Sequence, residues 1–147
     1  MQIAMLLGEE GGWTESPLQK VSMRWLAGGQ FDLRRAKNKL PLVLFRSPCD
    51  FRRIAIQKLE EIHLPWHCVL ESEGLIALRA AVKASIGITA LPVVRDDPDL
   101  SVLDEDGILP KLPTVAVRIK QHESWRSPVS RELKELIQEV WSSFGAN

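Results

Sequence analysis

Residues 41–92 read PLVLFRSPCDFRRIAIQKLEEIHLPWHCVLESEGLIALRAAVKASIGITALP, and the order of segments in this stretch decides the fold. PLVLF (41–45) is an uninterrupted apolar run, typical of a strand covered on both faces. Further along come two segments with helical periodicity and two strand-like runs, in the order helix 51–63, strand 66–71, helix 73–84 and strand 86–94. Alternating strands and helices predict an α/β fold with right-handed crossovers, a parallel-rich sheet and flanking helices on both faces.

Both helices of this stretch are preceded by a serine. We expect Ser47 to be the N-cap of the first helix, with Pro48 at N1 and Asp50 at N3, and Ser72 to cap the second. The apolar stripes expected to be buried are Phe51, Ala55, Leu59 and Ile62 on the first helix, and Leu75, Leu78, Ala81 and Val82 on the second.

Outside this stretch, apolar or alternating runs predict strands at 2–7, 20–27, 100–103 and 114–120. The first of these, QIAML, is apolar on both faces, as a central parallel strand would be. Ser127-Pro128 opens a final helix with seven large apolar residues on its stripe: Val129, Leu133, Leu136, Ile137, Val140, Trp141 and Phe144.

Composition limits the class of protein. The 147 residues suit one domain or two small lobes, and 45% hydrophobic residues are enough for a core. Nineteen basic and nineteen acidic residues cancel, which argues against DNA binding by these residues. Two cysteines, no export signal and no membrane-length apolar run favour the cytoplasm. The sequence contains neither a phosphate-binding glycine loop nor a GxSxG motif, so no motif of this kind indicates an enzyme.

The chain resembles the effector-binding domain of LysR-type transcription regulators over nearly its whole length. The resemblance rests on the apolar strand and small-residue turn at 41–50, on Glu71-Ser72 before the second helix, and on the closing GITALP (87–92). QIAML, VSMRWLAG and the C-terminal TVAVRI followed by a helix fit the same order. The family usually has aspartate where this chain has Gln2, and glycine where it has Ser85. Serine enters the left-handed helix-end conformation only at an energetic cost.

The resemblance implies a type II periplasmic-binding-protein-like fold with two lobes around a cleft. We expect one complete lobe II at residues 23–119 and a partial lobe I made of 1–22 and 120–147. The family's winged helix-turn-helix and the first half of lobe I would precede residue 1. A DNA contact would then need that missing N-terminal domain.

Two helix N-termini at the carboxyl edge of a parallel sheet form the candidate site, because free N–H groups there favour an anion. The resemblance places the effector against the turn at 48–51. The candidate effector-binding residues are Ser47, Pro48, Cys49, Asp50, Phe51, Ser72 and Thr89. The alternatives are plain helix caps for the serines and a buried strand position for Thr89. Glu71 either points inward as a polar handle or outward to solvent.

Two further features have structural and functional interpretations. Cys49 near a helix start could have a reactive thiolate, but a small residue packed beneath a turn is the favoured interpretation. His63, His67 and Cys68 resemble metal ligands, yet Pro65 separates the histidines, and strand neighbours point to opposite faces. We therefore expect neither a metal nor a cofactor.

The leading hypothesis is a small-molecule effector-sensing domain that is not an enzyme. We expect an anionic effector, because helix N-termini attract carboxylates. We also expect self-association into homo-oligomers and no membrane contact. A stand-alone solute-binding protein and a truncated product that antagonises a full-length regulator are the alternatives.

Overall fold

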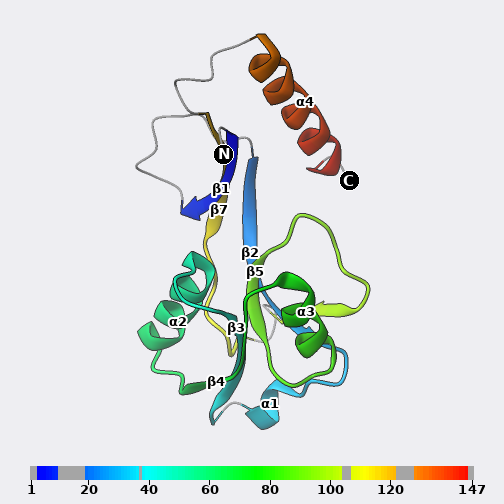
Figure 1. Ribbon diagram of the computed structural model, residues 1–147. Helices are drawn as coiled ribbons and strands as arrows, with labels where there is room; N and C mark the ends of the chain where they lie inside the picture. Colours follow the sequence, from blue (N-terminus) through cyan, green and yellow to red (C-terminus); the bar gives the residue numbers. More distant parts are fainter. Residues whose placement is uncertain (1–2, 10–18, 37, 104–106, 122–127, 146–147) are drawn as a thin grey trace. The chain divides into compact units, whose positions relative to one another are not determined.

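The computed structural model describes residues 3–9, 19–36, 38–103, 107–121 and 128–145 (Figure 1). Its elements are β1 (Ile3–Glu9), β2 (Gln19–Gly28), α1 (Leu33–Ala36), β3 (Leu40–Phe45), α2 (Asp50–Glu61), β4 (Trp66–Ser72), α3 (Leu75–Lys83), β5 (Thr89–Pro92), β6 (Leu100–Val102), β7 (Thr114–Gln121) and α4 (Pro128–Gly145). The predicted order of strands and helices is confirmed, although β5 is shorter than the strand predicted at 86–94. Gln2 and Ser127, which the predicted elements include, lie outside the described residues.

The chain divides into two compact units. Unit 1 comprises Met1–Ser22, Pro92–Arg95 and Pro113–Asn147, and unit 2 comprises Met23–Leu91 and Asp96–Leu112. Residues 113–119, which are expected in lobe II, belong to unit 1. The reason is that β7 pairs with β1 and with the first residues of β2. That the two units correspond to lobes I and II stays a prediction.

In unit 1, β7 lies between β1 and the start of β2 and is antiparallel to both. The prediction of a central parallel strand for QIAML is therefore wrong, because β1 pairs antiparallel and stands last in the strand order of the described residues. A strand's own apolar pattern does not specify the direction of its neighbour. Four residues of the α4 stripe are exposed: Val129, Leu133, Leu136 and Val140. The side chains of Trp141 and Phe144 are not among those that the structure describes.

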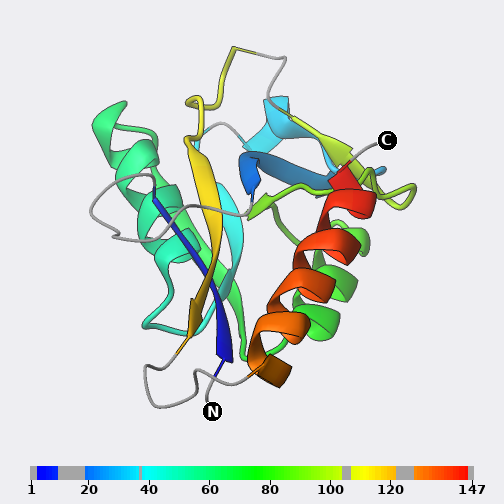
Figure 2. The ribbon, with the colours of Figure 1, turned by 90° about the horizontal axis from the view of Figure 1, so that it is seen from above.

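Unit 2 contains the parallel sheet that residues 41–92 predicted. β3 and β4 pair in parallel, and a parallel bridge joins Leu42 to Ile88 just before β5. The Val43 N–H donates to the Ile88 carbonyl oxygen at 2.8 Å. β6 completes the unit by pairing antiparallel with the end of β2. α2 and α3 lie on opposite sides of β3 in both Figure 1 and Figure 2, as the crossovers require.

The core of unit 2 forms where the two helices cover β3. Its fully buried side chains include Leu42 and Val43 from β3, Ile54 and Leu59 from α2, and Leu78 and Val82 from α3. The predicted stripes hold for Ala55 and Leu59 and for Leu78, Ala81 and Val82. They are wrong for Ile62 and Leu75, which are 46% and 54% exposed because they stand at the ends of their helices.

Both helices of unit 2 end in the same hydrogen-bonded motif. After α2, the His63 N–H donates to Glu60 and the Leu64 N–H to Leu59; after α3, the Ser85 N–H donates to Val82 and the Ile86 N–H to Ala81. This pair of bonds defines a Schellman motif, whose left-handed position is usually glycine. Here His63 (φ 56°) and Ser85 (φ 60°) occupy it. The strain expected at Ser85 is thus present.

No helix within the described parts of the chain is both long enough and apolar enough to cross a bilayer. This holds for α4, the 18-residue helix of unit 1, whose apolar residues are interspersed with charged ones.

Candidate functional site

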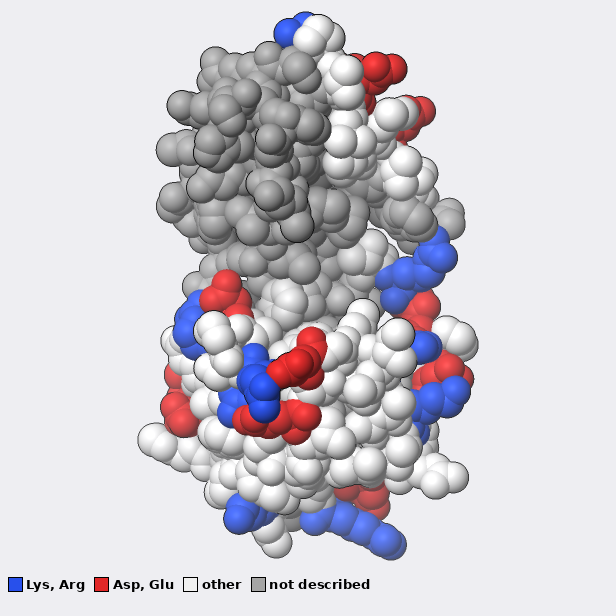
Figure 3. Space-filling model, viewed as in Figure 1, with Lys and Arg blue, Asp and Glu red and all other residues white. Residues whose placement is uncertain are grey.

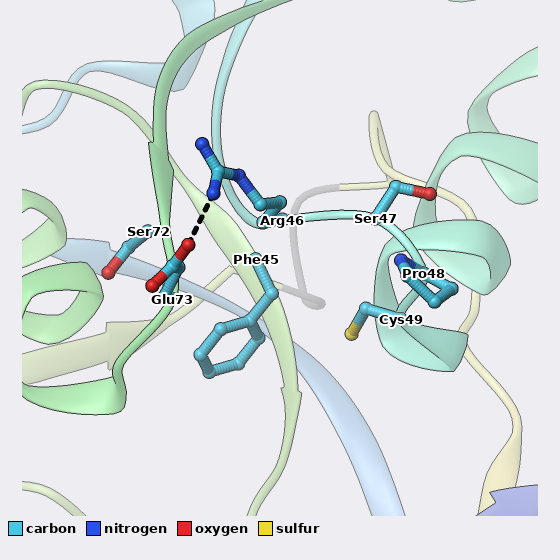
Figure 4. Close-up of a pocket in the computed structure, with 7 residues that line it drawn as sticks. All are labelled: Phe45, Arg46, Ser47, Pro48, Cys49, Ser72 and Glu73. Atoms are coloured by element: carbon cyan, nitrogen blue, oxygen red, sulfur yellow. Dashed lines mark hydrogen bonds and ion pairs between the residues drawn. The ribbon is translucent and has the colours of Figure 1, made fainter.

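A depression of about 400 Å³ lies in unit 2 at the edge of the β3–β4 sheet (Figure 4). Its lining residues are Phe45, Arg46, Ser47, Pro48, Cys49, Ser72 and Glu73. They come from two segments, the turn after β3 and the turn after β4. Because these strands are parallel, their carboxyl ends meet at one edge of the sheet. The backbone joins the two turns where the Arg46 N–H donates to the Ser72 carbonyl oxygen at 3.0 Å.

The N-terminus of α2 reaches this depression without a side-chain cap. Its N-cap is Cys49, whose backbone is extended and whose side chain makes no capping hydrogen bond. The prediction of Ser47 as N-cap is wrong, because the helix begins two residues later than expected, at Asp50. The Cys49 side chain therefore does not cap the N–H groups of the first turn, and the positive end of the helix dipole faces the depression without that cap.

The turn before α3 differs in the same way from its prediction. The N-cap of α3 is Gly74, also without a side-chain cap, and not Ser72. The Ser72 hydroxyl instead accepts from the Gly74 N–H at 3.2 Å and donates to the Gly74 carbonyl oxygen at 2.7 Å. Ser72 is 8% exposed, so its hydroxyl shapes the turn locally.

Four of the seven predicted site residues line the depression: Ser47, Pro48, Cys49 and Ser72. In Figure 4 the Ser47 hydroxyl points away from Arg46 and Glu73, whereas the Cys49 sulfur points to the side on which the Phe45 ring lies. Ser47 thus contributes its backbone and its β-carbon more than its hydroxyl.

The other three predicted residues are not among those that line it. Asp50 is exposed, and its carboxylate lies 3.6 Å from Arg53 on the next turn of α2. Phe51 is half-buried on α2, and Thr89 is 2% exposed on β5. For Thr89, the structure therefore matches the buried-strand alternative.

Three lining residues were not predicted: Phe45, Arg46 and Glu73. Arg46 and Glu73 form an ion pair through Nη1 and Oε1, although 27 positions separate them in the sequence. Phe45 packs partly against the buried cluster around Val43 and Leu78. The available signal was position, because Phe45 ends the strand predicted at 41–45, Arg46 follows it, and Glu73 follows Ser72.

A second arginine, Arg52, connects α2 to the ends of β3 and β4. Arg52 on α2 donates from Nη1 to the Phe45 carbonyl oxygen at 3.0 Å and to Glu71 Oε1 at 2.7 Å. Its side chain is only 19% exposed, in contrast to Arg46 at 67%. Glu71 therefore serves this link between α2 and the ends of both strands, and it does not line the depression.

Among the described residues, no cluster of three or more His, Cys, Asp or Glu side chains is placed to hold a metal ion. His63 is exposed at the end of α2, and His67 is half-buried on β4. Cys49 and Cys68 are both free thiols and half-buried.

On the face of unit 2 that Figure 3 shows, charged side chains largely lie next to side chains of the opposite charge. In most places where Figure 3 shows Lys or Arg, an Asp or Glu lies next to it. One such group joins α3 to the loop before β6: Arg79 holds Asp97 through both carboxylate oxygens, and Lys83 lies 2.8 Å from Asp99. The hydrogen bond from Arg79, followed by that from the Asp99 N–H, lowers the pKa of Asp97 to about 2.

Comparison with protein families gives a match to the LysR substrate binding domain over residues 9–142. A curated relative, the HTH-type transcriptional regulator PecT of Dickeya dadantii (strain 3937), is 43% identical over 72 residues. That match covers 49% of this chain and 23% of PecT, so the chain corresponds to a part of this relative.

Solved structures with the same fold include two regulatory domains. The apo regulatory domain of HypT from Salmonella typhimurium has a TM-score of 0.71 at 16% identity and covers 97% of this chain and 73% of its own. The effector binding domain of QuiR in complex with shikimate has a TM-score of 0.60, also at 16% identity, and covers 97% of this chain and 66% of its own. At these identities the likeness establishes the fold.

Proposed function

This chain belongs to the LysR substrate-binding domain family, and we propose that it senses a small anionic effector at the depression between the β3–α2 and β4–α3 turns. Family membership makes it an effector-binding domain of a transcription regulator. QuiR, a structural neighbour, is described in complex with shikimate, which is a carboxylate. The proposed ligand class for this chain is therefore a small carboxylate or a similar anion.

The uncapped N-terminus of α2 is the observation that carries this proposal. The side chain of the N-cap Cys49 does not accept from the first-turn N–H groups, and Cys49 itself lines the depression. Backbone N–H groups and the helix dipole at such a terminus attract a carboxylate. The guanidinium of Arg46 adds a donor on the same rim, and the Phe45 ring offers an apolar surface for the remainder of a ligand.

In the complete regulator, effector binding would bias the arrangement of parts that contact DNA. We assign DNA contact to other residues than these, because the 19 basic and 19 acidic residues cancel. Duplex binding by this chain tighter than about 10⁻⁶ M at physiological salt, with a steep salt dependence, would contradict that assignment. A cytoplasmic location and self-association are part of the same proposal.

Two substitutions at Cys49 test the anion site. Asp and Asn are both strong N-cap residues, so Cys49→Asp and Cys49→Asn should each keep α2 intact or raise its stability. Both would occupy the first-turn N–H groups, but only aspartate adds a negative charge. We expect the affinity for shikimate, measured by calorimetric titration, to fall about tenfold further in the Asp variant than in the Asn variant.

Uncharged ligands provide the control for this comparison. The methyl ester of shikimate should distinguish the two variants much less than shikimate does, because it lacks the carboxylate. Equal shikimate affinity in the wild type and both variants would contradict binding at the α2 N-terminus. The proposal would also be contradicted if, in a panel of small carboxylates, no carboxylate bound the wild type more tightly than its own methyl ester.

A further inference from the structure

The cation at the rim of the depression already has a carboxylate partner. Arg46 and Glu73 both line the depression, and Arg46 Nη1 pairs with Glu73 Oε1 across it (Figure 4). The pair leaves the charged lining residues with no net positive charge. An anionic ligand that approaches Arg46 therefore meets a guanidinium with one nitrogen, Nη1, already engaged, and a carboxylate of its own sign.

We propose that Glu73 is an internal competitor, meaning that its carboxylate occupies on Arg46 the position that an effector's carboxylate takes, and so sets the affinity and charge selectivity of the site. The proposal rests on the anion-binding function above and goes beyond it by assigning roles to two residues. Binding then consists of an exchange in which one carboxylate leaves the guanidinium and another arrives.

The exchange is feasible because the pair is held weakly. Its side chains are 67% and 75% exposed, and exposed ion pairs contribute little to stability. The two backbones are fixed independently of the pair. The Arg46 N–H donates to the Ser72 carbonyl oxygen, and the Ser72 hydroxyl bonds to Gly74 on the other side of Glu73. Releasing the Glu73 side chain therefore need not disturb either turn.

The neighbouring pair shows what a structural ion pair looks like in the same region. Arg52 is 19% exposed and is also bonded to the Phe45 carbonyl oxygen, so its pairing with Glu71 is tied into the fold. Glu71 precedes Glu73 by two positions but does not line the depression. Glu71 is thus the matched control for Glu73, because it carries the same charge near the depression but does not pair with Arg46.

Displacement of Glu73 would also carry a signal. The pair is a side-chain link between the β3–α2 turn and the β4–α3 turn, and a ligand that takes Arg46 removes that link. Ligand binding would then increase the mobility of the residues that lead into α3.

The experiment uses benzoate and its uncharged counterpart benzamide, titrated calorimetrically into the full chain. The variants are Glu73→Gln, Arg46→Gln, the double variant and the control Glu71→Gln. We expect Glu73→Gln to strengthen benzoate binding about three- to tenfold and to leave benzamide unchanged, as loss of one exposed competing charge allows. The gain should be absent when Arg46 is also replaced, and it should shrink in about 0.5 M salt.

The outcomes separate this inference from the function it rests on. Benzoate binding that Arg46→Gln weakens but that Glu73→Gln leaves unchanged or weakens would overturn the competitor and keep the anion site. An equal gain from Glu71→Gln would also overturn it, since the effect would then be one of general charge. If neither benzoate nor any other member of the carboxylate panel binds the wild type or a variant, both the competitor and the anion site are overturned.

Discussion

A β-carbon added to Gly28 would lie 2.6 Å from the Ser85 hydroxyl oxygen, because the end of β2 runs directly against the C-terminal end of α3. The same β-carbon would lie within 2.6 Å of the carbonyl oxygens of Val82 and Lys83. Carbonyl groups that end a helix cannot move aside without disturbing it. The close contact fixes α3 against β2, and α3 in turn follows the turn that lines the depression.

Gly28→Ala should therefore destabilise the chain. Overpacking of this kind costs about 1–3 kcal/mol, and here the contacts are with backbone. Gly29→Ala is the control, since a β-carbon there meets nothing within 4 Å. Urea unfolding should show a lower midpoint for Gly28→Ala alone, and equal midpoints would show that β2 and α3 separate readily.

Ser85→Gly should have the opposite effect. Serine at φ 60° is strained, and its hydroxyl oxygen is buried without a hydrogen-bond partner. Glycine removes both penalties, and we expect a gain of about 1 kcal/mol in the free energy of unfolding. His63→Gly tests the strain alone at the end of α2, because His63 is exposed, and it should give a smaller gain. Destabilisation by Ser85→Gly would mean that the hydroxyl has a role in the fold.

The ion pair between Arg79 and Asp97 predicts a pH dependence. The pKa of Asp97 is about 2 in the folded chain and 3.8 without its partners. Because the folded value is the lower one, the contribution to stability is complete above about pH 4 and is lost as the pH falls toward 2. The stability difference between wild type and Asp97→Asn should narrow over this interval. In an Arg79→Gln background, the Asp97 substitution should produce much less pH dependence.

The exposed apolar stripe of α4 predicts self-association. Val129, Leu133, Leu136 and Val140 recur at helical spacing and are 40–67% exposed. We expect light scattering to give a dimer or larger species, with contacts in residues 1–10 and 128–144. Leu133→Glu with Leu136→Glu should reduce the mass, whereas Gln138→Glu, also on α4, should not. A wild-type monomer throughout a dilution series would contradict this.

Residues 41–92 predicted most of unit 2, because local patterns carried the information. The unbroken apolar run of β3 and the spacing of Leu78, Ala81 and Val82 each indicate an element and its buried face without reference to a partner. The partner of β1 could not be predicted in this way. β1 pairs with β7, more than a hundred positions away, and an apolar strand suits either direction of pairing.

The residues that line the depression were predicted less completely. Ser47, Pro48 and Cys49 lie at the turn after β3, but the sequence Ser-Pro-Cys-Asp offers more than one helix start, and the helix uses the later one. Arg46 and Glu73 were missed because their importance lies in their pairing, which depends on the parallel register of β3 and β4. Thr89 was included because the pattern does not tell which face of a buried strand a threonine occupies.

Amide chemical shifts during titration with small carboxylates, benzoate among them, test the central claim most directly. For a 16.6 kDa chain, each backbone N–H can be followed through the titration. The account predicts saturable shifts that are largest in residues 46–52 and 72–75, at the two turns that line the depression. Carboxylates that shift other residues while leaving both of these segments unchanged, or that shift none, would contradict it.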